Sequence, residues 1–115
     1  MFDFEKLEVY QKAKYFNTTV FDFIKSVNLK DRIINDPLWR ASLSIMLNIA
    51  EGCSRFSKAD KRHFFVISHG SVFECVSVFD FLKSISAMDI FQFNDFYLLS
   101  EELSKMLFSL IQKLK

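Results

Sequence analysis

The sequence predicts an all-α protein whose single domain, residues 1–115, is an antiparallel up-and-down four-helix bundle. The chain has 115 residues, of which 50% are hydrophobic, so it can bury a sizeable core without disulfides or metals. Two glycines and one proline leave little material for the tight turns of a β-sandwich or a barrel. Apolar residues recur every three or four positions along four segments, which is the period of an amphipathic helix.

The first helix is expected from Phe4 to about Val27. Its apolar positions follow the helical period: Leu7, Tyr10, Ala13, Phe16, Val20, Phe21, Ile24 and Val27. Lysines and an aspartate occupy the rest of the helical wheel. The pattern breaks over Asn28–Asp36, where Lys30–Asn35 is compatible with a short helical turn.

The second helix is expected to begin at Asp36-Pro37. An aspartate can cap a helix, and a proline in the first turn lacks only an amide hydrogen that is unpaired there. The helix should end near Gly52, because glycine commonly terminates helices.

The third and fourth helices are placed by their own capping residues. The hydroxyl of Ser57 and the carboxylate of Asp60 resemble a capping box, so the third helix should begin there and fade near Met88. The pair Asn94-Asp95 is expected to cap the fourth helix, which runs to the end of the chain. Short connections between the four helices favour antiparallel neighbours and therefore a bundle.

Phenylalanine is unusually abundant, with 15 residues in so small a chain. A four-helix monomer can bury only part of this aromatic surface, so some of it is expected to face another subunit. The phenylalanines assigned to such intersubunit packing are Phe2, Phe4, Phe91, Phe93 and Phe96.

Charge and cysteine content argue against several classes of protein. The formal net charge is +1, and residues 37–62 form the only locally basic segment. Cys53 and Cys75 lack a CxxC spacing, which argues against a disulfide framework or a zinc module and fits a reducing cytoplasm. The uncharged runs Ala41–Ala50 and Phe64–Phe73 are too short to span a membrane, so a cytoplasmic protein with no membrane partner is expected.

A polar stripe interrupts the otherwise apolar second helix. Four side chains fall within about 80° of one another on a helical wheel: Arg40, Ser44, Asn48 and Glu51. Because such a helix is buried on most sides, the stripe needs polar partners, and the candidates are Arg40, Arg55, His69, Ser71 and Glu74.

This stripe has two interpretations. It is either a site that faces a ligand or RNA, or a network of hydrogen bonds and ion pairs that fixes helix register and subunit pairing. The second interpretation is preferred, and the residues assigned to the network are Ser44, Asn48, Glu51, His69, Ser71 and Glu74.

Five cations are the candidate nucleic-acid contacts: Arg40, Arg55, Lys58, Lys61 and Arg62. The last four lie beside His63 and are interleaved with Phe56 and Phe64, and cations with exposed aromatic rings can neutralise phosphates and stack on bases. The alternative is a solvated first turn of the third helix. A ring of subunits would repeat the cluster and multiply its effect.

The sequence predicts no catalytic residue, metal site or cofactor. Its serines have no His and Asp arrangement in evident reach, and neither Glu51 nor Glu74 belongs to the Glu-x-x-His pattern of a diiron bundle. His63 and His69 are six residues apart, which turns them about 120° away from each other on a helix.

Several segments together resemble one known family: Phe4–Ala13, Arg40-Ala41 with Ser44-Ile45, Asn48–Gly52, Arg55, Ser57, and Gly70-Ser71 with Glu74. They resemble the four-helix-bundle proteins encoded in intervening sequences of bacterial large-subunit ribosomal RNA genes. The resemblance implies an up-and-down bundle that assembles as a homopentamer. It also implies similarity to the accessory variability determinants of diversity-generating retroelements, which bind a reverse transcriptase and nucleic acid.

The expected function is therefore non-enzymatic. An oligomeric helical bundle would act by binding RNA or another nucleic acid, or a nucleic-acid-processing partner such as a reverse-transcriptase-like protein. The alternative is a structural homo-oligomer, or scaffold, without affinity for nucleic acid. The family often has two successive arginines where this chain has Trp39-Arg40, and a proline where it has Met46.

Overall fold

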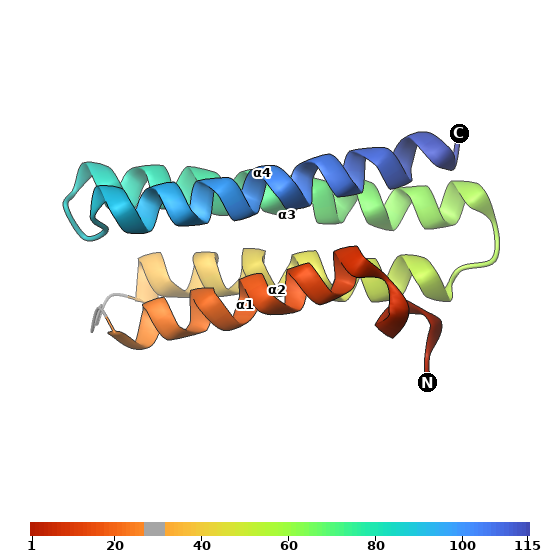
Figure 1. The fold of residues 1–115 in the computed structure, drawn as a ribbon, viewed down its shortest axis with the longest axis horizontal. Helices are drawn as coiled ribbons and strands as arrows, with labels where there is room; N and C mark the ends of the chain where they lie inside the picture. Colours follow the sequence, from red (N-terminus) through yellow and green to blue (C-terminus); the bar gives the residue numbers. More distant parts are fainter. Residues whose placement is uncertain (27–31) are drawn as a thin grey trace.

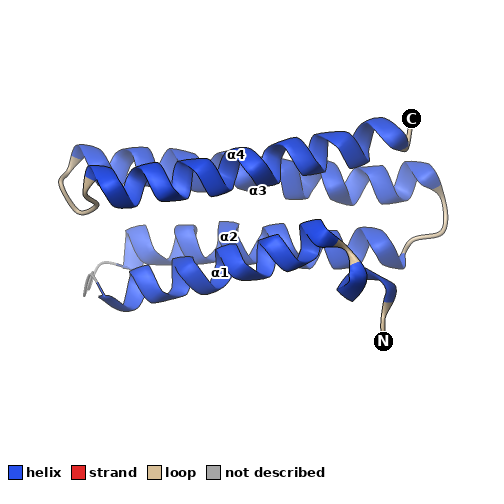
Figure 2. Cartoon of the chain, viewed as in Figure 1, coloured by secondary structure: helices blue, strands red, loops and turns tan. Residues whose placement is uncertain are grey.

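The computed structural model describes residues 1–26 and 32–115, with side chains from residue 35 onward in the second range. A short 3-10 helix, η1 (Asp3–Lys6), precedes four α-helices: α1 (Glu8–Ser26), α2 (Arg32–Ser54), α3 (Lys58–Ser84) and α4 (Ile90–Lys113). Successive helices run in opposite directions along a body of 44 × 23 × 22 Å (Figure 1). Every regular element in the described residues is helical (Figure 2), which confirms the antiparallel up-and-down four-helix bundle.

The start of α3 agrees with the sequence prediction. Ser57 is the N-cap, and its hydroxyl accepts a hydrogen bond of 3.1 Å from the backbone N–H of Asp60. The first helix begins later than expected, at Glu8, because η1 takes up the residues from Asp3 to Lys6. Its expected end at Val27 lies outside the described residues. The first residues of the break expected over Asn28–Asp36 lie outside them too.

The predicted start of the second helix is wrong. α2 begins at Arg32 and continues through Pro37, which lies inside the helix rather than in its first turn. Pro37 is exposed and lacks a backbone N–H, so the helix loses one hydrogen-bond donor there. Leu38 and Ala41, within the next turn, are buried and hold the helix against the core. Tertiary packing therefore outweighs the local proline signal.

The predicted end of the second helix is also displaced. Gly52 lies within α2, which continues to Ser54, and no described glycine has a positive φ. Gly52 instead allows a close approach, because a Cβ atom there would lie 2.7 Å from Cε1 of Phe65. The glycine serves the packing of α3 against α2 rather than the termination of a helix.

The N-cap of the fourth helix lies five residues before Asn94, the first residue of the predicted cap. Asp89 is the N-cap, and its carboxylate accepts from the backbone N–H of Gln92 at 2.8 Å. The side chain of Gln92 accepts in turn from the backbone N–H of Asp89 at 3.1 Å, which completes a capping box. Asn94 and Asp95 are exposed residues inside α4.

An aromatic cluster fills the centre of the bundle. Phe79 of α3 and Phe96 of α4 stack with ring centroids 4.5 Å apart, and Phe16 of α1 meets both rings edge-on. Phe96 is only 4% exposed, so its assignment to a subunit interface is wrong. Phe96 lies at helical spacing from the other buried residues of α4, Ser100, Leu103 and Leu107, so it is on the face of the helix that packs into the core.

One buried polar pair joins α1 to α2. The hydroxyl of Ser42 donates to Oδ1 of Asn17 at 2.5 Å, and Nδ2 of Asn17 lies 3.7 Å from the sulfur of Met46. No pattern in the sequence indicated Asn17 or Ser42. The polar seam predicted from the sequence lies on the other side of α2, where α3 packs.

Helix α3 is the described helix whose length and apolar composition would allow it to cross a membrane. Its length and mean hydropathy are sufficient although its uncharged run, Phe64–Phe73, is shorter than a membrane span. Its buried residues face the other helices, and they are Phe65, Ser68, Ser71, Val72, Cys75, Phe79 and Leu82. The apolar composition of α3 is thus that of a central core helix, with extensive packing against α2 and α4.

Candidate functional site

The polar seam of α2 divides into separate groups in three dimensions. Nδ2 of Asn48 donates to the backbone oxygen and to the hydroxyl of Ser44, both at 2.9 Å. The hydroxyl of Ser71 on α3 donates to Ser44 Oγ at 2.8 Å. These three residues form a hydrogen-bond network that links α2 to α3.

Beside this network lies a shallow groove on the outer face of α2 and α3. Its volume is about 310 Å³, and it is lined by Pro37, Arg40, Ala41, Ser44, Ser71 and Glu74. Arg40 and Glu74 are both exposed, and they lie on different helices of the groove. The groove therefore presents one cation, one anion and two hydroxyls to whatever packs on this face.

His69 was expected in the seam but lies on the other side of α3. Its Nε2 is 3.0 Å from the hydroxyl of Ser104 on α4, and its ring packs against Phe73 with centroids 5.0 Å apart. Burial lowers the pKa of His69 below its ordinary value of 6.5, so the neutral imidazole is favoured. Ser104 also lines a groove of about 500 Å³ between α3 and α4.

The cations near the α2–α3 connection have specific partners. Nη2 of Arg55 is 2.6 Å from Oε1 of Glu51, and the guanidinium lies over the ring of Phe64 at 4.6 Å. Nζ of Lys61 donates to the backbone oxygen of Cys53 at 3.4 Å. This carbonyl belongs to the last turn of α2, where the helix dipole favours a cation.

Arg62 joins the C-terminal end of α4 to the same region. Its Nη1 donates to the backbone oxygen of Leu114 at 2.6 Å, and this oxygen also lies at a helix C-terminus. Lys113 and Lys115 flank Leu114 in the sequence and are exposed. The contact therefore places these two lysines beside the cations at the start of α3, a grouping that was not predicted from the sequence.

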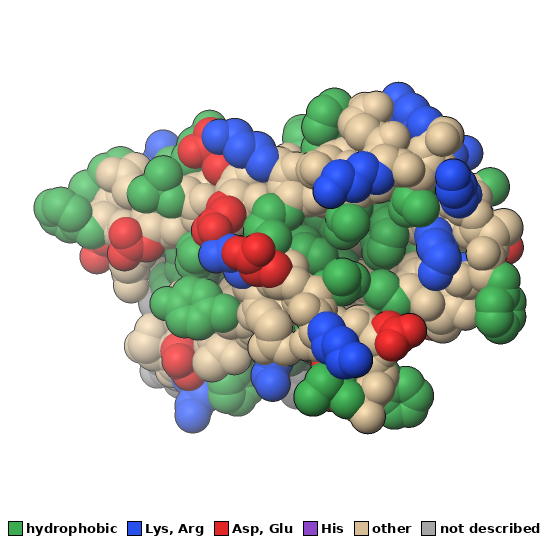
Figure 3. Space-filling model, turned by 45° about the vertical axis from the view of Figure 1, so that its right-hand side comes forward, with side chains coloured by type: hydrophobic (Ala, Val, Ile, Leu, Met, Phe, Trp, Pro, Cys, Tyr) green, Lys and Arg blue, Asp and Glu red, His purple; other side chains and the backbone are tan. Residues whose placement is uncertain are grey.

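We call this surface the basic end, and it consists of Arg55, Lys58, Lys61, Arg62, Lys113 and Lys115. Figure 3 brings this end of the bundle forward and shows Lys and Arg side chains gathered over it. Arg40 is not part of it, because α2 continues for another 14 residues after Arg40, about 21 Å, before it ends next to Arg55. An antiparallel bundle places the end of α4 beside the start of α3. This topology, which the sequence predicts, could therefore have indicated that Lys113 and Lys115 lie near the cations of α3.

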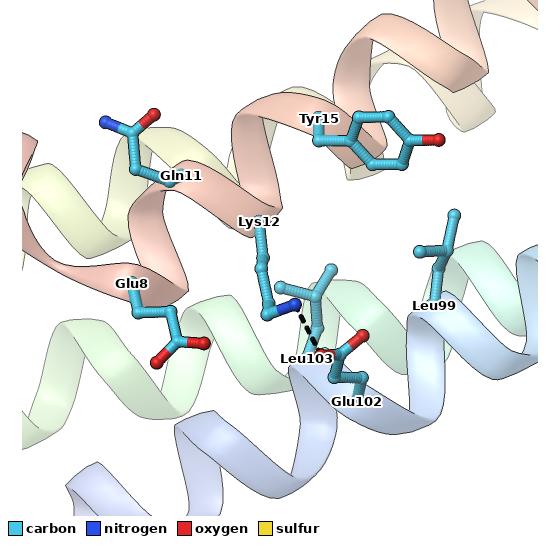
Figure 4. A pocket seen from close by; sticks show the side chains of 7 residues that line it. All are labelled: Glu8, Gln11, Lys12, Tyr15, Leu99, Glu102 and Leu103. Atoms are coloured by element: carbon cyan, nitrogen blue, oxygen red, sulfur yellow. Dashed lines mark ion pairs between the residues drawn. The ribbon is translucent and has the colours of Figure 1, made fainter.

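A further cavity of about 350 Å³ lies between α1 and α4 (Figure 4). Nζ of Lys12 and Oε1 of Glu102 form an ion pair of 2.5 Å across it. The hydrogen bond to Glu102 raises the pKa of Lys12. Both side chains are substantially exposed, so the pair adds little to stability but links the two helices at the surface.

Neither thiol is an activated nucleophile. Burial raises the pKa of Cys75 to about 12, and burial also raises the pKa of Cys53. A high thiol pKa leaves almost no thiolate at neutral pH, and the thiolate is the reactive form. In residues 1–26 and 32–115, no three His, Cys, Asp or Glu side chains come together as a metal site would require.

Comparison with known proteins gives both a family and a similar fold. Residues 5–109 match the 23S rRNA-intervening sequence protein family. The fold is similar to the crystal structure of a protein with unknown function from the S23 ribosomal protein family of Bacteroides thetaiotaomicron VPI-5482, with a TM-score of 0.84 and 23% sequence identity. That comparison covers 90% of this chain and 97% of the other, and no curated protein matches. Because the family match spans nearly the whole sequence, this chain belongs to the 23S rRNA-intervening sequence protein family.

Proposed function

We propose that this chain is a non-enzymatic binding protein that assembles into a homo-oligomer and binds RNA, or a protein that processes nucleic acid, through its basic end. The observation that carries the proposal is the gathering of cations from the α2–α3 connection, the start of α3 and the end of the chain at one end of the bundle. Phosphate groups are the natural partners of such a surface, because each contact with Lys or Arg releases counterions from the nucleic acid.

The basic end keeps donors available after its internal contacts are made. Lys58 is exposed and has no partner in the described part of the chain, and Lys115 is likewise exposed. Arg62 commits only one of its five N–H donors to Leu114. The internal contacts hold the cations in place, and the remaining donors can reach a phosphate.

Assembly would strengthen a weak individual site. The net charge of +1 limits the attraction that one subunit exerts at long range. A homopentamer, the assembly that the resemblance implies, would present five basic ends, and their combined avidity would exceed that of each site. A reverse-transcriptase-like partner is the protein ligand that the same resemblance suggests.

A scaffold without affinity for nucleic acid is the second candidate, and the exposed apolar surface favours it. Large hydrophobic side chains remain on the outer faces of all four helices, among them Tyr15, Leu47, Ile67, Phe73, Phe81, Leu98 and Phe108. Exposed apolar area of this kind is typical of surfaces that bind other proteins or other copies of the chain. Both candidates therefore include self-association.

Salt-dependent binding separates the two candidates. The full chain would be titrated into fluorescently labelled generic RNA at several salt concentrations, with anisotropy as the readout. We expect an affinity that falls steeply with salt, and the double variant Lys58→Gln/Lys115→Gln should bind more weakly with a shallower slope. The control is Lys14→Gln/Lys105→Gln, which removes two exposed cations outside the basic end. No binding at low salt by the assembled protein would contradict the nucleic-acid proposal and leave the scaffold.

A further inference from the structure

Phe56 is the most exposed large hydrophobic side chain at the basic end. It is 101% exposed, and it lies in the connection between α2 and α3, next to Arg55 and two residues before Lys58. A phenyl ring left entirely in water contributes nothing to the bundle core, so the fold itself gives no reason for an aromatic residue at this position. A partner that covers the ring would recover the free energy of burying it.

The connection that carries Phe56 is held at both sides. Before it, the backbone N–H of Arg55 donates to the oxygen of Gly52 at 3.2 Å, and Arg55 pairs with Glu51. After it, Ser57 caps α3 through Asp60. The ring is therefore presented from a short connection with defined hydrogen bonds, and ordering it on a ligand costs little conformational entropy.

The faces of the Phe56 ring are open. The guanidinium of Arg55 lies over Phe64 instead, at 4.6 Å from the ring centroid, and Phe64 also meets His63 edge-on at 5.2 Å. These contacts occupy Phe64 within the protein. Phe56 is the aromatic ring of this pair that remains available for stacking on a flat ligand.

We propose, building on the function above, that the basic end binds single-stranded nucleic acid in preference to duplex, with Phe56 stacking on an unpaired base. In a duplex the faces of the bases are covered by their neighbours, and only the edges are reachable from the grooves. A single strand offers free base faces, and aromatic side chains beside cations are the usual means of binding it. Lys58 and Arg62 then contact the phosphates next to the stacked base.

The experiment compares one RNA strand in two forms, alone and annealed to its complement. We expect the full chain to bind the single strand at least about tenfold more tightly than the duplex, and Phe56→Ala to weaken single-strand binding by roughly tenfold. The salt slope of Phe56→Ala should match that of the original protein, because no cation is removed. Phe91→Ala is the matched control, since Phe91 is also highly exposed but lies at the opposite end of the bundle.

The possible failures are distinguishable. If strand and duplex bind equally and Phe56→Ala has no effect, the stacking role is overturned while the basic end remains a nucleic-acid site. If neither form binds at low salt, the function proposed above fails as well. A third outcome is that RNA does not bind, whereas the protein binds vesicles of anionic phospholipid and Phe56→Ala abolishes that binding. Phe56 would then contact a membrane, and the inference would be wrong. Circular dichroism of each variant verifies that the bundle is folded.

Discussion

At the scale of single residues, the two glycines of the chain occupy opposite environments. A Cβ atom at Gly52 would lie 2.7 Å from Cε1 of Phe65 and 3.2 Å from the backbone oxygen of Lys61. Phe65 is buried, so its ring has little freedom to move away. A Cβ atom at Gly70 would meet nothing within 4 Å. One glycine is required by packing, and the other is only a flexible residue within a helix.

We therefore expect the same substitution to have opposite effects at the two positions. Gly52→Ala should lower the free energy of unfolding by about 1–3 kcal/mol, because the methyl group overpacks the α2–α3 contact. Gly70→Ala should raise it by about 0.5–1 kcal/mol, because alanine restricts the unfolded chain and favours the helix. Urea denaturation followed by circular dichroism measures both. Equal effects at the two positions would show that the close approach of Phe65 is not maintained in solution.

At the scale of elements, the four helices were predictable, but several of their ends were not. Helical periodicity extends over many residues, so it identified each segment despite local ambiguity. Caps are decided by single residues, and both Asp89 with Gln92 and Asn94-Asp95 were chemically plausible starts for α4. The choice depends on where Phe96 meets Phe16 and Phe79, which is a long-range property that local patterns do not contain.

The start of α4 can be tested by removing each candidate cap. Asp89→Ala deletes the acceptor for the backbone N–H of Gln92 and should cost about 1 kcal/mol in the free energy of unfolding. Asp95→Ala changes an exposed residue inside the helix and should alter the free energy by less than about 0.5 kcal/mol. Thermal and urea unfolding of the two variants decide between the starts. A larger loss in Asp95→Ala would favour the start predicted from sequence.

The contact of His69 with α4 makes the α3–α4 pair sensitive to pH. Because burial lowers the pKa of His69 below 6.5, the unfolded chain binds a proton more readily than the folded one. The contribution of neutral His69 to stability is therefore complete above the pKa that His69 has in the unfolded chain. It is lost as the pH falls through the lower pKa that His69 has in the folded protein. In the protonated ring both nitrogens carry a proton, so Nε2 can then only donate to the hydroxyl of Ser104, which lies 3.0 Å away.

We expect the free energy of unfolding to decrease as the pH is lowered below about 6.5, before the carboxylates titrate. His69→Gln should flatten this part of the curve. The matched control is His63→Gln, which removes an exposed imidazole and should leave the decrease unchanged. Urea unfolding at several pH values measures the effect, and a decrease that persists in His69→Gln would assign it to other groups.

At the scale of the whole molecule, sequence reasoning grouped the candidate site residues only in part. It placed Ser44, Asn48 and Ser71 in one network because their helical positions face a neighbouring helix. It joined Arg40 to the other cations because they are all basic, although the length of α2 separates them. The contribution of Lys113 and Lys115 became visible only when Arg62 was seen to bind the end of α4. Such groupings depend on which helix ends meet, and composition does not encode that.

The outer face of α2 and α3 is where we expect self-association to be most sensitive to mutation. Leu47 is 53% exposed and Ile67 is 39% exposed, and both lie on the helical stripes that carry the seam residues. These apolar side chains beside the polar groove combine hydrophobic area with hydrogen-bonding groups that can fix orientation, as subunit interfaces commonly do. Burying Leu47 in an assembly would therefore favour association.

Leu47→Glu should shift the protein to smaller species at micromolar concentration in size-exclusion chromatography with light scattering, because a buried carboxylate without a partner is costly. The fold of the subunit should be retained, since Leu47 is already exposed within one chain. Thr18→Glu adds the same charge at an exposed polar position of α1 and should leave the assembly unchanged. An oligomer that persists in Leu47→Glu would place the interface on another face. A monomer before any substitution would instead remove the avidity on which tight binding by the basic end depends.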